Sequence, residues 1–488
     1  MIEKLKIIRG PTRAIIEVSP YSPYRFVLRY FVKRRLTDYE WEPKFQKFAP
    51  NRQYVTFDPR LDLIFIPINF VPLLINELEQ EGIPYCFSDE RVVRPRKLSV
   101  SMLPSFTPRP HQVGIIEYLR QKNVPRKGLA TYTGSGKTVS SIAGAIAYGY
   151  VTMIIVSGLT QQWLRSIEEF TNITEDKLYL IQGFKSLEDL LNSDLKPDII
   201  VFSLETLRLY IQHEGAYKSI IPYKRFLKKY GIGTKIIDEV HLNFHADTLI
   251  DLKSNVENNV YLTATFTSTN KSTRRIFDLI YPASMRYGSE HSNIYVDVYS
   301  YSYCGEVNEQ KCMTNRGYMH IKYEKQLLKK RTKLNSFFIR VLYPIINSHW
   351  VNKKKDGEKI LIYFSMLDTV NAAYNWLVQM YPGYKIAKYV GTAEDSVLVD
   401  NDIILTNPKK SGCGTDIKNL RTIINTVSSK SDTQVLQLFG RLRELPDGTT
   451  PEYIETYDIN LTSHRRHAGE REVLLMAHAR NYIKYHIP

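Results

Sequence analysis

The sequence predicts an α/β protein whose central part is a doubly wound parallel sheet. Residues 151–156 form an uninterrupted apolar run that is typical of a parallel strand, and the runs at 198–202 and 235–237 are also expected to be strands. Segments with helical spacing separate these runs, and strands that alternate with helices form parallel sheets with right-handed crossovers. A glycine-rich turn at 131–138 stands between a short strand and a small apolar helix, which is the setting of a phosphate-binding loop.

Length and charge indicate a multidomain protein with a polyanionic partner. A chain of 488 residues is too long for one compact core, so we expect two to four domains. Lys and Arg number 66 against 50 Asp and Glu, for a formal net charge of +16. Such a basic excess favours nucleic acid as the partner, and a merely solubilising charge is the alternative.

Cysteine usage and hydropathy predict a protein of a reducing, intracellular compartment. The 4 cysteines include no CxxC pair, which argues against a zinc module or a disulfide framework. The N-terminus lacks the apolar core of a signal peptide. The most apolar stretch, 61–75, is interrupted by Asp62, Pro67, Asn69 and Pro72, so we expect no membrane span and a cytoplasmic location.

Residues 1–95 are predicted to form a small basic α+β domain that binds nucleic acid. Strands are expected at 6–9 and 13–18, and helices at 23–35 and 71–81. Cations interleaved with aromatic residues suit phosphate neutralisation and base stacking, although core aromatics beside a solvated helix face would give the same pattern. The predicted phosphate contacts are Arg25, Arg29, Lys33, Arg34 and Arg35. A proline-rich junction at 104–110 follows, and we expect few contacts to cross it.

The glycine-rich turn carries the residues expected to bind ATP and Mg²⁺. Its glycines let backbone N–H groups surround the phosphates, and the helix N-terminus adds the positive end of its dipole. Lys137 would reach the β- and γ-phosphates, and the Thr138 hydroxyl would hold Mg²⁺. Upstream, Gln112 can read an adenine edge, because its amide both donates and accepts hydrogen bonds. The predicted loop contacts are Gly134, Ser135, Gly136, Lys137 and Thr138.

An acidic pair follows the apolar strand at 235–237. Two buried carboxylates are costly unless they are used. Asp238 can hold Mg²⁺ through water, and Glu239 can polarise the water that attacks the γ-phosphate. The alternative interpretation is an exposed Asp-Glu turn, but that would not explain the apolar character of the strand before it. Thr263 and Thr265 follow the next strand, where their hydroxyls are well placed to sense the acidic pair.

The three motifs, in order GSGKT (134–138), DEVH (238–241) and TAT (263–265), resemble the first motor domain of superfamily 2 helicases. The strand at 359–365, the segment SGCGTD (411–416) and QLFGR (437–441) are similar to the second domain of these motors. The resemblance covers about residues 105–460. It implies two RecA-like doubly wound domains with ATP between them, the second without a phosphate loop.

The resemblance also assigns roles to further residues. Gly414 and Asp416 would contact the nucleotide, and His241 and Gln437 would couple its state to movement. Arg441 and Arg443 would stabilise the γ-phosphate from the second domain. The family pattern places its last arginine at position 444, where this chain has Glu444. It therefore stays open whether Arg441 or Arg443 is the main arginine that contacts the γ-phosphate.

The domain layout is similar to that of the phage UvsW-like branch-migration DNA helicases, as are the segments RPHQ (109–112) and VSGLTQQW (156–163). We expect a basic domain at 1–95, motor domains at 96–290 and 291–488, and a C-terminal helix at 470–484. The resemblance implies an ATP-driven enzyme that remodels branched or forked DNA, both double- and single-stranded, and R-loops with an RNA–DNA hybrid. Its setting would be replication, recombination or repair, in the host cytoplasm if the protein comes from a phage.

The alternatives are an RNA helicase, a restriction-type translocase subunit, and a nucleic-acid clamp with an inert motor. The sequence leaves the oligomeric state, the polarity of movement and the preference between DNA and RNA open.

Overall fold

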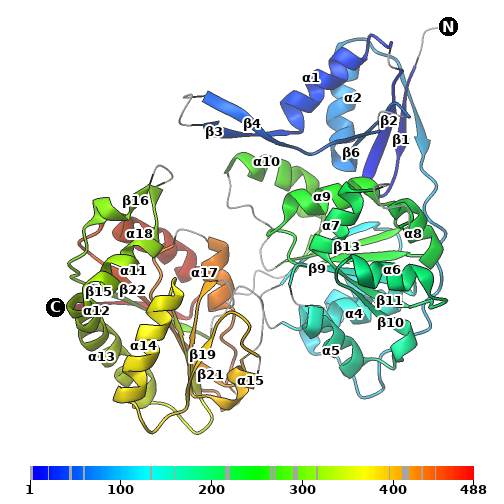
Figure 1. Cartoon of the computed structure of the whole chain (residues 1–488). Helices are drawn as coiled ribbons and strands as arrows, with labels where there is room; N and C mark the ends of the chain where they lie inside the picture. Colours follow the sequence, from blue (N-terminus) through cyan, green and yellow to red (C-terminus); the bar gives the residue numbers. More distant parts are fainter. Residues whose placement is uncertain are drawn as a thin grey trace. The chain divides into compact units, whose positions relative to one another are not determined.

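The computed structural model describes residues 4–19, 21–42, 47–58, 61–131, 135–158, 160–214, 220–263, 266, 271–288, 295–314, 317–394, 396–408, 417–429, 432–445 and 447–488. The chain divides into two compact units. One unit holds the N-terminal module and the first parallel sheet, and the other holds the second parallel sheet (Figure 1).

The N-terminal module is a mixed five-stranded sheet of order β5-β6-β2-β1-β7, with two helices and a separate hairpin. Its neighbouring strands are antiparallel except β1 and β7. Helices α1 and α2 lie side by side (Figure 1). The expected strands and helices are confirmed within one to two residues at most ends. The elements are β1 (Leu5–Arg9), β2 (Arg13–Glu17), α1 (Arg25–Arg35), β3 (Thr37–Glu42), β4 (Lys47–Gln53), β5 (Thr56–Asp58), β6 (Leu63–Pro67), α2 (Val71–Gln80) and β7 (Tyr85–Asp89).

The first parallel sheet has seven strands in the order β10-β11-β9-β12-β13-β8-β14. All its pairs are parallel. The three strands predicted at 151–156, 198–202 and 235–237 are confirmed as β9, β11 and β12, and all their residues except Ser203 are buried. The strands are β8 (Arg126–Ala130), β9 (Thr152–Val156), β10 (Leu178–Ile181), β11 (Ile199–Ser203), β12 (Thr234–Ile237), β13 (Asn258–Thr263) and β14 (Arg286–Tyr287). The helices are α3 (Pro110–Leu119), α4 (Lys137–Tyr148), α5 (Thr160–Phe170), α6 (Phe184–Asn192), α7 (Leu204–Gln212), α8 (Tyr223–Tyr230), α9 (Phe244–Lys253) and α10 (Lys271–Ile280).

The second parallel sheet also has seven strands, in the order β19-β20-β18-β21-β22-β15-β23. All its pairs are parallel, so the fold is two RecA-like doubly wound domains after a small mixed sheet, as expected. The strands are β15 (Asp297–Tyr303), β18 (Lys359–Tyr363), β19 (Ile386–Tyr389), β20 (Ile403–Thr406), β21 (Leu420–Asn425), β22 (Glu452–Asp458) and β23 (Asn481–Ile487). The main helices are α11 (His320–Lys329), α12 (Arg331–Phe337), α14 (Leu367–Met380), α17 (Asp432–Phe439) and α18 (Thr462–Met476).

The C-terminal segment corrects one expectation. The expected helix at 470–484 ends at Met476, and residues 481–487 form β23, which pairs in parallel with β15. The sequence of β23, NYIKYHI, is rich in Tyr and Ile, which favour strands. Asp297 of β15 fixes the start of β23, because it accepts hydrogen bonds from Arg480 (2.9 and 2.6 Å) and from Asn481 Nδ2 (2.8 Å).

The N-terminal module packs closely on the first parallel sheet, which corrects the expectation of few contacts across the junction. Thr12 Oγ1 donates to the carbonyl oxygen of Asp251 (2.9 Å), and Arg13 Nη1 donates to that of Leu252 (2.7 Å). Arg126 of β8 donates to Asn69 Oδ1 (2.5 Å). One hydrophobic core cluster also joins the two parts. The module and the sheet therefore form one compact unit.

Within the described ranges, none of the helices combines the length and apolar character that crossing a membrane would need.

Candidate nucleotide site

The phosphate loop turns into α4 through Gly136, which has a φ of +78°. A side chain at this position would be strained, and its Cβ would lie 2.0 Å from Gln112 Nε2. Ser135 is buried, and its Oγ has no hydrogen-bond partner among the described residues. Thr138 is half-buried in the first turn of α4, whereas Gly134 lies outside the described residues. The glycine and the unsatisfied hydroxyl are what a loop that receives a phosphate needs.

Two side chains of α3 hold this loop by its backbone. The ring nitrogen Nε2 of His111 lies 2.8 Å from the carbonyl oxygen of Ser135, and Gln112 Nε2 donates to the same oxygen at 3.3 Å. Gln112 Oε1 accepts from the backbone N–H of Arg109 (2.8 Å). Gln112 is thus placed beside the loop with its amide engaged, and adenine reading by it stays a prediction. The sequence analysis assigned no role to His111. Its position directly before Gln112 was the signal that could have indicated one.

The loop lysine and the acidic pair lie together. Lys137 Nζ is 3.1 Å from Glu239 Oε1. Burial alone would lower the pKa of Lys137, but the carboxylates of Glu239 and Asp238 outweigh it, so this pKa is raised. Burial raises the pKa of Asp238, with the charge of Lys137 opposing. The three groups therefore form one electrostatic cluster, in which the lysine keeps its charge beside two carboxylates.

The carboxylate of Asp238 is fixed at both oxygens. The indole Nε1 of Trp163, a buried residue of α5, donates to Oδ2 over 2.9 Å. The backbone N–H of Glu239 donates to Oδ1 over 3.0 Å. Sequence reasoning did not single out Trp163, although it lies in the segment VSGLTQQW on which the family resemblance was based. A carboxylate oriented in this way is suited to receive a metal or its bound water.

Glu239 has a φ of +53°, in the left-handed region that residues other than glycine avoid. Such a conformation costs roughly 1–2 kcal/mol and persists where the surroundings impose it, which is common at functional sites. Glu239 Oε2 lies 3.3 Å from His241 Nδ1, and the same nitrogen lies 2.7 Å from Thr263 Oγ1. The structure thus brings Glu239, His241 and Thr263 together, while their coupling role stays a prediction. Thr265 lies outside the described residues.

Burial and the charge of Lys137 lower the pKa of His241 to about 4, so this imidazole is neutral at pH 7. A neutral imidazole can exchange its donor and acceptor roles with the Thr263 hydroxyl without adding charge beside Lys137.

These residues meet because their strands are neighbours. The loop follows β8, the acidic pair follows β12, and Thr263 ends β13, which lies between β8 and β12. In a parallel sheet the carboxyl ends of the strands share one edge, where α/β proteins bind their ligands. The residues present fit magnesium-bound ATP: Lys137 and the loop suit the phosphates, and Thr138 and Asp238 offer oxygens to Mg²⁺.

Three predicted residues of the second domain lie on or just after α17. Gln437 is half-buried on the helix, and Arg441 is buried just beyond its end. Arg443 is half-buried, and its guanidinium donates to the carbonyl oxygens of Gly440 and Leu442. Gly414 and Asp416 lie outside the described residues. The roles of all five toward a nucleotide stay predictions.

Three of the five predicted phosphate contacts on α1 also have acidic partners. Arg34 and Arg35 lie 3.5 and 3.2 Å from Glu77 of α2. Arg25 lies 3.8 Å from Asp62. The remaining two, Arg29 and Lys33, are exposed.

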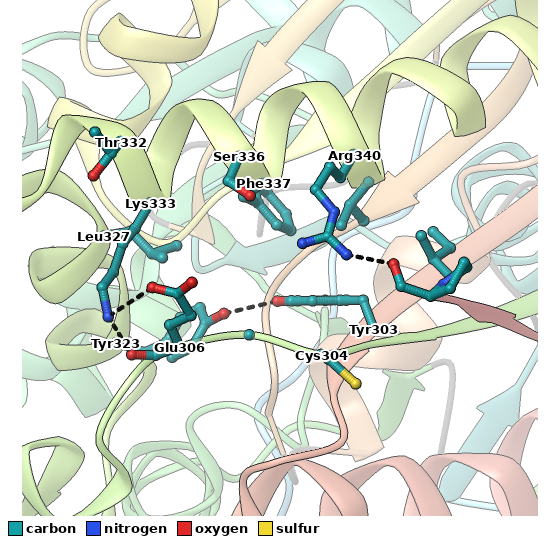
Figure 2. A pocket seen from close by; sticks show the side chains of 14 residues that line it. Tyr303, Cys304, Glu306, Tyr323, Leu327, Thr332, Lys333, Ser336, Phe337 and Arg340 are labelled. Carbon is teal, nitrogen blue, oxygen red and sulfur yellow. Dashed lines mark hydrogen bonds and ion pairs between the residues drawn. The ribbon is translucent and has the colours of Figure 1, made fainter.

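The second domain also contains a pocket of about 150 Å³ between the end of β15 and α12 (Figure 2). None of its lining residues is a predicted site residue. Its two cations are engaged, since Lys333 lies 3.4 Å from Glu306 and Arg340 donates to the carbonyl oxygen of Pro488 (Figure 2). The pocket is therefore separate from the candidate nucleotide site.

Two seven-stranded parallel sheets, preceded by a small mixed sheet, confirm the RecA-like fold that the sequence predicts. T4 UvsW is similar to this chain, with 14% identity, coverage of 100% of both chains and a TM-score of 0.37. The helicase domain of Pyrococcus furiosus Hef is similar over 75% of this chain and 98% of its own, with 14% identity and a TM-score of 0.47. No protein-family model matches the sequence, and no curated protein does. The function proposed below rests on the residues of this chain and not on these two likenesses.

Proposed function

We propose that the protein is an ATP-dependent DNA helicase or translocase of superfamily 2 that remodels branched DNA by branch migration and fork regression, and that also unwinds R-loops. The observation that carries the proposal is the cluster of Lys137, Asp238 and Glu239, together with the buried hydroxyl of Ser135 in the phosphate loop, which has no hydrogen-bond partner among the described residues. A charged lysine, two carboxylates and a glycine turn at one sheet edge are the parts that hydrolysis of a nucleoside triphosphate uses.

Magnesium-bound ATP supplies the phosphoryl group whose transfer to water drives the motor. Lys137 breaks its contact with Glu239 and neutralises the β- and γ-phosphates instead. The lysine is charged when the nucleotide arrives, because the carboxylates around it raise its pKa. Asp238, whose carboxylate accepts a hydrogen bond from Trp163, would hold Mg²⁺ together with Thr138. Glu239, released from the lysine, accepts a proton from the attacking water. Arg441 and Arg443 stabilise the charge that develops on the γ-phosphate.

Release of Glu239 also changes its contact with His241, whose Nδ1 is hydrogen-bonded to Thr263. We infer that this trio reports the state of the acidic pair to the segment after β13, which leads to α10. Since α10 contacts the N-terminal hairpin through Thr273 and Asp38 (2.7 Å), a movement there would reach the N-terminal module.

The net charge of +16 and the basic helix α1 support DNA as the partner. The proposed location is the cytoplasm, and the proposed setting is replication, recombination or repair.

The test is ATP-dependent strand displacement on a fork, a four-way junction, a simple duplex and an RNA–DNA hybrid of equal length, with Lys137→Ala as the control variant. We expect displacement on the fork and the junction at rates above those on the simple duplex, and none with Lys137→Ala. A marked preference for the hybrid would instead indicate an RNA helicase. Binding without displacement or hydrolysis on every substrate would indicate a clamp and contradict the proposal.

A further inference from the structure

Helix α1 has one buried face and one face that carries aromatic rings and cations. Leu28, Phe31 and Val32 are buried in the N-terminal core. On the opposite side, Phe26 is 77% exposed and Tyr30 is 52% exposed. Arg29 and Lys33, also exposed, complete a stripe at positions 26, 29, 30 and 33, which share one face of a helix. We call these four residues the α1 stripe.

Single exposed apolar side chains are ordinary, but these two aromatic rings lie one turn apart on the same face, where they form a continuous exposed surface together with two cations. Neither ring stacks on another ring or under a cation in the part of the chain that the structure describes. The stripe is therefore available to a partner.

Charge restricts the partner to a polyanion. The sequence of α1, RFVLRYFVKRR, contains no acidic residue. Arg34 and Arg35 are directed to Glu77 of α2, and Arg25 to Asp62, whereas Arg29 and Lys33 have no ion pair within the described residues. Among the described residues, the cations of α1 without an ion pair are thus Arg29 and Lys33, which share a face with the two aromatic rings. A surface that combines free cations with flat rings suits a nucleic acid strand.

The helix is held firmly on the first motor domain. Arg275 of α10 donates to the carbonyl oxygens of Arg34 (3.2 Å) and Arg35 (3.4 Å) at the C-terminal end of α1. A cation at this end also interacts favourably with the helix dipole. Because α1 is anchored at one end by the motor and along one face by the core, its stripe keeps a fixed position relative to the candidate nucleotide site in the same compact unit.

We propose that the α1 stripe binds unpaired nucleotides at the branch point of the substrate, with bases stacked on Phe26 and Tyr30 and phosphates neutralised by Arg29 and Lys33. This inference rests on the proposed function and adds which part of the substrate the module recognises. Two rings four residues apart on a helix are separated by about 6 Å along its axis, nearly twice the 3.4 Å between stacked bases of a duplex. They therefore suit two splayed bases, while the bases of an intact duplex are covered by their neighbours.

The experiment uses the full chain with Phe26→Leu and Tyr30→Leu, singly and together, because Leu preserves helix propensity and apolar area but removes the ring. Tyr30→Phe is the conservative variant. Phe57→Leu is the matched control, since Phe57 is a 52% exposed ring on β5 of the same module. The substrates are a fork with 2-aminopurine in its unpaired arm and a blunt duplex of the same length, each measured across a salt series.

We expect the 2-aminopurine emission to change on binding, and the affinity for the fork to fall about tenfold for each ring lost. The affinity for the blunt duplex should change less than twofold, and Tyr30→Phe and Phe57→Leu should resemble the wild type. Arg29→Gln with Lys33→Gln should reduce the log–log salt slope on the fork by roughly 1.4, which is about 0.7 for each single-strand phosphate. Melting curves confirm that each variant is folded.

Equal losses on the fork and the blunt duplex would overturn the proposal, because they would make the stripe a general duplex grip. Unchanged affinity for both substrates in the double variant would also overturn it, and would leave a protein partner as the occupant of this face. In either case DNA-stimulated ATP hydrolysis by the wild type would show that the proposed function stands. Its absence in the wild type would contradict the proposed function itself.

Discussion

The indole nitrogen of Trp163 donates a 2.9 Å hydrogen bond to Asp238 Oδ2. This contact links α5 to the carboxylate that we assign to the metal. The other carboxylate oxygen, Oδ1, accepts a hydrogen bond from the backbone N–H of Glu239. Because Asp238 is buried and its pKa is raised by that burial, each donor that remains helps to keep the carboxylate ionised and oriented. Trp163 is accordingly a positioning residue for the proposed metal site.

Trp163→Phe should raise the Mg²⁺ concentration needed for half-maximal ATP hydrolysis by about 10–100-fold, the usual effect of losing a hydrogen bond behind a metal ligand. The variant keeps a buried ring but leaves Asp238 Oδ2 without its donor. Titration of ATP hydrolysis with Mg²⁺ measures the effect. The matched control is Trp350→Phe, because Trp350 is equally buried and its Nε1 has no hydrogen-bond partner in the described residues. A similar Mg²⁺ shift in both variants would mean that packing, not the hydrogen bond, is responsible.

Glu239→Gln should bind ATP with little change and hydrolyse it about 10²–10⁴-fold more slowly, the usual contribution of a general base. The amide preserves the shape of the side chain at the unusual φ of +53°, but it cannot accept the proton of the attacking water. Nucleotide binding by equilibrium titration and single-turnover hydrolysis separate the two properties. Parallel losses of affinity and turnover would make Glu239 a metal ligand instead.

Arg441→Ala and Arg443→Ala should both slow hydrolysis, with Arg441→Ala the more severe. An arginine that stabilises phosphoryl charge contributes about 10³–10⁵ in rate in related reactions. Arg443 donates to the carbonyl oxygens of Gly440 and Leu442 and so needs to break these contacts before it reaches a nucleotide. Turnover numbers at saturating ATP and DNA decide the order. An unaffected Arg441→Ala beside an inactive Arg443→Ala would reverse the alignment of this motif.

A buried histidine in the second domain predicts acid sensitivity. His464 Nδ1 accepts a hydrogen bond from the backbone N–H of Asp458 (3.1 Å), and its Nε2 is hydrogen-bonded to the hydroxyl of Tyr318. Nδ1 accepts only while it is unprotonated. Burial and the nearby positive charges hold the pKa of His464 well below its usual range. The titratable groups around it are His320, His467, Arg471, Tyr318 and Tyr323.

Since the folded pKa of His464 lies below the unfolded value of about 6.5, the unfolded state binds more protons as the pH falls. Stability is therefore fully present above pH 6.5 and decreases below it. Melting curves between pH 5 and pH 8 should show this decrease, and it should be smaller in His464→Asn, whose Oδ1 can replace Nδ1 as the acceptor. The same pH dependence in the variant and the wild type would assign the effect to other groups.

The sequence was sufficient for the elements whose pattern is local. Strand β9 is a nearly continuous apolar run, β12 ends in two isoleucines directly before the acidic pair, and the loop before α4 carries its glycines in place, so their positions were predicted to within two residues. The helix expected at 470–484 failed because residues 481–487 are held by β15, a strand almost two hundred residues away, and no local pattern specifies that pairing. Long-range pairing overrode the helical interpretation of this segment.

The candidate site was predictable where motif and chemistry coincide, as for Lys137, Asp238 and Glu239. Trp163 and His111 were missed because their roles depend on hydrogen bonds to residues 75 and 24 positions away. The sequence analysis treated the cations of α1 as one group of phosphate contacts. Only the fold shows that Arg34 and Arg35 lie against Glu77, whereas Arg29 and Lys33 are exposed. The junction at 104–110 suggested separable domains, whereas the buried bonds of Thr12 and Arg13 join the two parts.

We propose that Lys137, Asp238 and Glu239 form the catalytic centre of a DNA-driven ATPase. The most direct test of this proposal is the rate of ATP hydrolysis by the full chain with and without forked DNA, compared with Lys137→Ala at equal concentration. We predict that forked DNA strongly stimulates hydrolysis by the wild type, and that Lys137→Ala binds the same DNA but hydrolyses ATP at the background rate. Hydrolysis by Lys137→Ala close to that of the wild type, or a wild type that forked DNA leaves unstimulated, would contradict the account.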